Sequence, residues 1–275
     1  MKKITIVNTG AGAISGAAGA AIGLTGGPVG SLAGAAIGSF LGDVFKDVAS
    51  RMLSHRERVR LDNATSYIAD GIADELKAGR IVRQDDFFEG SNNFSSDAAE
   101  LLEGVLLKCK AQFQEKKVRL LANIFKNVAF NDTITAETAY QLLNLVDGLS
   151  YFQLCQIAYY GRQQEFVNSQ ILNDFYGAYS ESLTEENHSA ARDLYELSEQ
   201  RIFQDVDGSS NPGEPGAVNP AHIRLAVRGR EAFDLLELQQ IPAEDVLKAI
   251  KPLEYQGSWG ASSRGAVNGR KPGAS

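Results

Sequence analysis

Hydrophobic and polar positions change character once along the chain, close to residue 42. From Ile4 to Gly42 there are 39 residues without an ionisable side chain, whereas the remainder mixes apolar and charged positions at helical spacing. The uncharged stretch holds eleven glycines, nine alanines and only eleven strongly apolar residues. It is longer than the ~20 residues that cross a bilayer core. The pattern therefore predicts a membrane helix or hairpin at the N-terminus.

Glycines in this stretch recur every fourth residue, which places them on one stripe of a helix. Such a stripe lets a neighbouring helix approach backbone to backbone, as in membrane helix pairs. Because Gly and Ala contribute little transfer free energy, we expect weak insertion of a single copy and association into an oligomeric bundle that forms a pore. The predicted packing positions are Gly19, Gly23, Gly27, Gly30, Gly34, Gly38 and Gly42.

The membrane topology stays open between two forms. Gly26, Gly27 and Pro28 interrupt the stretch near its middle, so it forms either a hairpin or one kinked helix. Downstream, an apolar stripe predicts a helix from Asp43 to about Arg60 that carries five Lys or Arg residues. Basic residues next to a membrane segment favour the cytoplasmic side. We therefore expect the soluble part to be cytoplasmic.

Two other interpretations of the N-terminus compete with a membrane segment. Gly10-Ala11-Gly12 follows a short apolar run, but the third glycine of a dinucleotide-binding fingerprint would fall at Ser15 and no acid follows until Asp43. We reject dinucleotide binding on these grounds. A secretory signal peptide is the weaker alternative, because the glycine repeat continues far past any cleavage point.

The rest of the chain predicts a mainly α-helical soluble region. Ser96 and Thr135 are expected N-caps, and Lys116, Lys117 and Arg119 are expected to be exposed. Apolar periodicity predicts helices at about 64–77, 97–130 (one long helix or two in tandem), 135–148, 149–160, 184–198 and 231–238.

The C-terminal part changes to an α+β pattern. Two short strands, 201–206 and 222–227, are separated by a loop rich in Gly, Pro and Asn, with a helix on either side. This order is that of a winged-helix unit with the loop as its wing. The Gly- and Ser-rich end predicts a disordered tail. The expected divisions are 1–42 (membrane segment), 43–130 (juxtamembrane and long helical region), 131–255 (helical, winged-helix-like domain) and 256–275 (tail).

Chemistry-bearing residues are sparse. The chain has a net charge of −7, three separated histidines and two isolated cysteines, so we expect neither an enzyme nor a bound metal or cofactor. Arg224, Arg228 and Arg230 are the candidate ligand-binding residues. The helix at 185–194 carries more acid than base, which argues against duplex DNA. A nucleotide or short oligonucleotide signal stays open, as does a protein-interaction role.

The overall layout resembles a known class. A Gly/Ala zipper, a helical middle and an end reading Ile223-Arg224-Leu225-Ala226-Val227-Arg228-Gly229-Arg230-Glu231-Ala232-Phe233 resemble abortive-infection (Abi-alpha-like) proteins, although Ala226 replaces the usual Thr. The layout is also similar to membrane-channel effectors of bacterial antiphage operons, such as the Hailong-type channel protein. The resemblance implies a homo-oligomeric effector of the bacterial inner membrane, silent until a partner enzyme's nucleic-acid-like signal binds the soluble part.

Two hypotheses follow. The first is a gated pore in which residues 4–42 of several copies pack through their glycines in the lipid bilayer. The second is a soluble winged-helix regulator that binds nucleic acid and carries a flexible Gly/Ala-rich arm. The two differ in cell fraction, in membrane permeability and in retardation of DNA.

Overall fold

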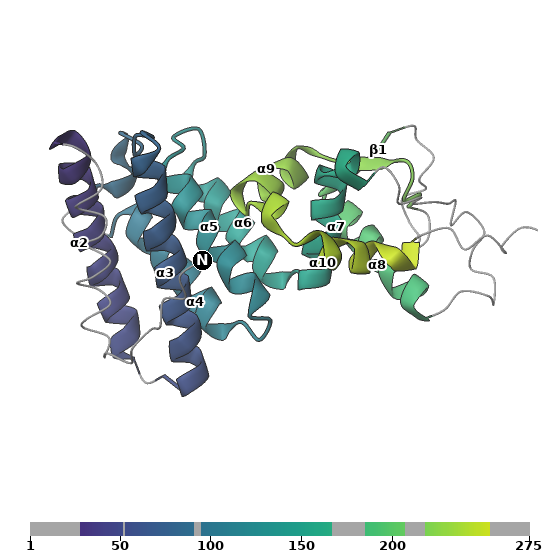
Figure 1. Cartoon of the computed structure of the whole chain (residues 1–275), viewed down its shortest axis with the longest axis horizontal. Helices are drawn as coiled ribbons and strands as arrows, with labels where there is room; N and C mark the ends of the chain where they lie inside the picture. Colours follow the sequence, from purple (N-terminus) through teal and green to yellow (C-terminus); the bar gives the residue numbers. More distant parts are fainter. Residues whose placement is uncertain (1–27, 52, 91–94, 167–184, 207–217, 254–275) are drawn as a thin grey trace, which may run out of the picture.

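The computed structural model describes residues 28–51, 53–90, 95–166, 185–206 and 218–253 (Figure 1). This part of the chain is mainly helical, as the sequence predicts. The α-helices are α2 (Pro28–Ser50), α3 (His55–Lys77), α4 (Asp97–Ala111), α5 (Lys116–Ala129), α6 (Ala136–Gly148), α7 (Tyr151–Gly161), α8 (Glu185–Glu199), α9 (Val227–Leu235) and α10 (Ala243–Ile250). The shorter elements are strands β1 (Phe203–Asp205) and β2 (Ile223–Leu225) and the 3₁₀ turns η1 (Asp86–Phe88), η2 (Gln163–Phe166), η3 (Leu238–Gln240) and η4 (Lys251–Leu253).

Helices α2 to α6 form a bundle around α4 and α5. Helix α3 packs against both of them, α6 packs against their other side, and α2 packs on α3 and α4. In Figure 1, α2 lies at the edge of the molecule as the outermost helix of the bundle. The division expected at residue 42 falls inside α2, which continues without a break to Ser50.

The single helix expected from Asp43 to Arg60 is wrong. Helix α2 ends at Ser50, and α3 begins at His55 and runs unbroken to Lys77. The break arises because Ser54 and Glu57 form a capping box: Ser54 Oγ accepts a hydrogen bond from the Glu57 backbone N–H, and Glu57 Oε2 accepts one from the Ser54 N–H at 2.8 Å. The apolar stripe alone does not contain this Ser-x-x-Glu signal for the start of a helix.

The expected caps at Ser96 and Thr135 are confirmed, since each side chain accepts a hydrogen bond from the backbone three residues on. Residues 97–130 form two helices in tandem. The expected exposure of Lys117 is wrong. Its buried ammonium donates to the carbonyls of Asp147 (3.0 Å) and Leu149 (2.6 Å), so it satisfies the carboxyl end of α6. Burial lowers the pKa of Lys117.

The C-terminal half is organised around α7, which contacts α8, α9, α10 and β2. Strands β1 and β2 pair antiparallel, with Gln204 opposite Arg224. Helix α10, which the sequence analysis did not predict, packs on α7. The described elements thus follow the order helix, strand, strand, helix from α8 to α9; most of the loop expected as a wing (207–217) and the expected tail (256–275) lie outside the described residues.

Candidate functional site

The carboxyl-terminal half of α2 lies in a groove between α3 and α4. Ile37, Leu41, Phe45 and Val48 share one face of α2 and are all buried. The opposite face carries exposed polar residues: Ser39, Asp43, Lys46, Asp47 and Ser50. Helix α2 is therefore amphipathic where its side chains are described, and the hydrophobic effect holds it to the bundle along one side.

Aromatic residues fix α2 in this groove. The Phe40 ring meets Phe88 of η1 edge-on at a centroid distance of 5.8 Å and stacks near Phe125 of α5 at 6.4 Å. Phe45, one turn on, is 1% exposed. Just beyond the helix, Arg51 pairs with Glu103 of α4 at 2.5 Å across two partly exposed side chains. Because an exposed ion pair contributes little, apolar contacts dominate the attachment of α2.

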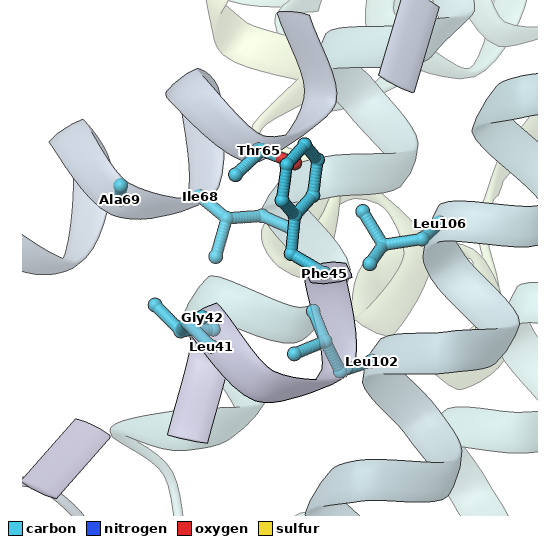
Figure 2. A pocket seen from close by; sticks show the side chains of 8 residues that line it. All are labelled: Leu41, Gly42, Phe45, Thr65, Ile68, Ala69, Leu102 and Leu106. Atoms are coloured by element: carbon cyan, nitrogen blue, oxygen red, sulfur yellow. The ribbon is translucent and has the colours of Figure 1, made fainter. Parts of the chain in front are cut away.

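A small cavity of about 10 Å³ remains where α2, α3 and α4 meet (Figure 2). Such a space holds one water molecule at most. In Figure 2, the Phe45 ring lies between Thr65 and Ile68 of α3 on one side and Leu106 of α4 on the other. Its walls are formed by Leu41, Gly42, Phe45, Thr65, Ile68, Ala69, Leu102 and Leu106.

The predicted glycines divide into three groups. Gly19, Gly23 and Gly27 lie outside the described residues. Gly30 and Gly34 belong to α2, so the four-residue repeat from Gly30 to Gly42 lies on one helix. Gly38 and Gly42 are buried, and Gly42 borders the cavity between α2, α3 and α4. The described end of the glycine stripe therefore packs against this chain's own helices.

None of the helices in the described ranges is both long enough and apolar enough to cross a membrane.

A second feature, which sequence reasoning missed, joins the bundle to the C-terminal half. On α5, Asn123 and Asn127 donate hydrogen bonds to the carbonyls of Leu236 (3.0 Å) and Leu235 (2.9 Å), which end α9. Lys126 forms an ion pair with Glu237, the next residue along. These contacts satisfy carbonyls that a helix leaves unpaired at its end. We call this set of contacts along α5 the polar seam.

The polar seam also reaches α3, the helix on which α2 rests. The Lys126 side chain is 7% exposed, and its Nζ lies 3.8 Å from Glu75 of α3. Gly71 of α3 makes room for it, since a Cβ there would stand 2.5 Å from Lys126 Cδ. At the other end of the seam, Lys116 pairs with Asp245 of α10 at 2.6 Å. Lys126 therefore connects the C-terminal half to α3, the helix against which α2 packs.

The signal for the seam was present in the sequence. Asn123, Lys126 and Asn127 lie on one face of α5, at three- and four-residue spacing, in the part of the helix after Arg119 that is otherwise apolar. A polar stripe on a buried helix indicates polar partners. Its partners could not be identified, because Leu235, Leu236 and Glu237 are more than a hundred residues away along the chain.

The three candidate arginines are exposed and each has its own protein contact. With the Gln204 amide turned so that its oxygen faces β2, that oxygen accepts hydrogen bonds from Arg224 at 2.6 and 3.0 Å. Arg228 donates to the Gln200 carbonyl at 3.3 Å, and the guanidinium of Arg230 lies 5.4 Å from the Phe233 ring centroid. Arg224 lies on β2 and the other two on the first turn of α9.

The buried thiols are not activated. Burial raises the pKa of the Cys155 thiol to about 12, with the charge of Asp245 adding to the effect, and burial likewise raises the pKa of Cys109. Neither forms the thiolate that acts as a nucleophile near neutral pH. Within the described ranges, no three His, Cys, Asp or Glu side chains stand close enough to hold a metal ion.

Asp193 on α8 makes the stability of the protein depend on pH. Partial burial, followed by the charge of Glu196, raises the pKa of Asp193 to about 6. The ordinary value is near 3.9, so the charged form costs folding free energy above pH 6, and this cost is relieved as the pH falls through that value toward 4. We expect Asp193→Asn to stabilise the protein at pH 7 by about 1 kcal/mol, allowing for solvent screening, and to lose this gain near pH 4.

Urea unfolding at both pH values measures this effect, with Glu199→Gln on the same helix as the control. An equal gain at both pH values would contradict the assignment to Asp193.

Comparison with known proteins gives no match: no family model fits this sequence, and no curated protein and no solved structure is significantly similar to it.

Proposed function

We propose that this protein is a conditional pore-forming effector of the bacterial inner membrane, acting in abortive-infection defence against phage as a homo-oligomer. The observation that carries the proposal is the continuity of the uncharged Gly/Ala segment with α2, a peripheral helix attached along one apolar face. In this proposal the structure described above is the resting form, and α2 leaves the groove when the protein is triggered.

The glycine stripe supports such a switch because two partners compete for it. In the resting form Gly38 and Gly42 lie against the chain's own bundle. Once α2 is released, the same stripe offers close backbone packing to other copies inside the bilayer. Because Gly and Ala give little transfer free energy, insertion requires this association. Because the chain's own bundle and the other copies compete for the stripe, the pore forms only after α2 is released.

The C-terminal half is proposed as the sensor. The order of α8, β1, β2 and α9 supports a winged-helix-like unit, and Arg224, Arg228 and Arg230 supply positive charge for a nucleotide or short oligonucleotide. The acidic start of α8 (Glu185, Glu186) argues against duplex DNA. Binding near α9 would reach α3 through the polar seam, and α3 supports α2.

The test of this function is leakage of ions across the membrane of cells that express the full chain. Gly34→Leu together with Gly38→Leu places two bulky side chains on the glycine stripe, so we expect leakage and toxicity to fall sharply. Ser39→Leu with Ser50→Leu adds two bulky apolar side chains on the exposed face of α2, away from the stripe, and is the control. Undiminished leakage in the glycine variant would contradict the pore.

Cell fractionation before and after triggering separates the pore from the alternative regulator. The pore requires the chain in the membrane fraction after triggering. Permanent recovery in the cytosol, together with retardation of DNA that weakens steeply with salt, would favour the winged-helix regulator with a flexible arm.

A further inference from the structure

An exposed aromatic residue stands at the end of the bundle where α3 begins. Phe113 lies in the connection between α4 and α5 and is 86% exposed. Burying a phenylalanine side chain is favourable by about 1.5–3 kcal/mol, so a protein that leaves one in water forgoes considerable stability. The side chains around Phe113 therefore indicate which kind of partner would cover it.

Helix α3 runs beside this connection and extends the exposed apolar surface. Arg60 Nε donates to the Lys110 carbonyl at 2.9 Å, and the Arg119 guanidinium lies 5.9 Å from the Tyr67 ring centroid. Residues 110–119 thus follow α3 from its second turn, at Arg60, to Tyr67. Spacings of three and four residues place Arg56, Val59 and Tyr67 on one face of α3. Val59 and Tyr67 are each 41% exposed.

The charge around these side chains is positive, in contrast to the chain as a whole. Arg56 and Arg119 are exposed, and Lys110 is partly exposed. The nearby acids are Glu57, whose carboxylate is held in the capping box with Ser54, and the exposed Glu115 and Asp70, of which Asp70 lies one turn beyond Tyr67 on α3. The net charge of the whole chain is −7. We call Arg56, Val59, Tyr67, Lys110, Phe113 and Arg119 the basic-aromatic patch.

We propose that the basic-aromatic patch docks the protein on the surface of an anionic lipid bilayer. A phenylalanine on a loop tip enters the boundary between headgroups and acyl chains, while Lys and Arg around it attract anionic headgroups. The two ends of this chain do not complement the patch in charge, because residues 1–27 carry two lysines and no acid and residues 254–275 carry three bases and one acid. Residues 167–184 and 207–217 each carry two acids and no base, so they are the competing occupants within the chain, and binding that does not need anionic lipid would favour them over the bilayer.

The position of the patch determines which part of the protein would face the bilayer. It lies beside the turn between α2 and α3, so a docked protein holds the carboxyl end of α2 next to the bilayer. This consequence for α2 rests on the proposed function, whereas binding of the patch to lipid does not. The two are therefore tested by different measurements.

The experiment is co-sedimentation of the full chain with vesicles of phosphatidylcholine alone or mixed with phosphatidylglycerol. We expect binding that needs phosphatidylglycerol and weakens with salt. Phe113→Ser and Lys110→Glu are each expected to weaken it about tenfold. Ile81→Ser, which changes an apolar residue that is 76% exposed elsewhere, and Arg192→Glu on α8 are the matched controls and should bind as the wild type does.

Wild-type binding by Phe113→Ser and Lys110→Glu would overturn the proposal, as would equal binding to both kinds of vesicle. If Phe113→Ser instead dissociates an oligomer in lipid-free solution, the patch is an interface between copies and the proposal is also wrong. The paired glycine substitutions that block leakage leave the patch intact. Loss of leakage with retained vesicle binding thus separates failure of the pore from failure of the docking surface.

Discussion

Replacing Phe45 by alanine is expected to release α2 from its groove. Phe45 is 1% exposed and borders the cavity between α2, α3 and α4. Truncating a buried phenylalanine costs about 3–5 kcal/mol, which is a large share of what can hold one peripheral helix. Because α2 lies at the edge of the bundle, we expect the loss to appear first as opening of α2 and not as unfolding of the core.

Hydrogen exchange of the full chain measures this opening, with Ser39→Ala on the exposed face of α2 as the control. Faster exchange confined to residues 37–50, with more membrane leakage before triggering, is the expected result. If Phe45→Ala unfolds α3 to α5 together with α2, the helix is an inseparable part of the core and the proposed release is contradicted.

Replacing Lys126 by methionine is expected to cost about 3–5 kcal/mol and to loosen the C-terminal half from the bundle. The substitution leaves the carboxylate of Glu237 largely buried without its partner, and breaking one side of a buried pair is strongly destabilising. Glu75 keeps an ion pair with Arg80 at 3.1 Å, so most of the cost falls on Glu237. We therefore expect Lys126→Met with Glu237→Leu to recover most of the loss.

Urea unfolding of the single and double variants forms the thermodynamic cycle that measures this coupling. Lys77→Met, which removes an exposed pair with Asp74, is the control and should change stability by less than about 0.5 kcal/mol. Additive effects of the two seam substitutions would mean that Lys126 and Glu237 do not depend on each other, and the seam would then carry no coupling from α9 to α3.

Local signals in the sequence predicted the local structure well. Ser96 and Thr135 cap helices as expected, and Gly79 ends α3 with φ at 81°, a left-handed conformation that glycine adopts without strain. The pairing of the two short strands also follows the prediction. Caps and turns depend on neighbouring residues, which is why one sequence suffices for them.

A long-range partner explains one of the failed predictions, and an overlooked local signal explains the other. Lys117 was expected at the surface because lysine usually is, but the carbonyls at the end of α6 supply a buried partner. The expected helix across Ser54 followed the apolar stripe and overlooked the capping box. In the candidate site, the four-residue glycine repeat correctly marks a helix from Pro28 onward. It does not reveal that Gly38 and Gly42 are buried, or that Gly42 borders side chains of α3 and α4 of the same chain.

The most direct test of the account is the accessibility of the α3 surface beneath α2. Ala69 is 5% exposed and borders the cavity at this interface, so Ala69→Cys places a small thiol there. The native thiols give little background, because both are buried and their pKa values are raised. The account predicts that a polar thiol reagent labels Ala69→Cys only when the membrane begins to leak. Leakage while this position stays protected would contradict release of α2 as the event that opens the pore.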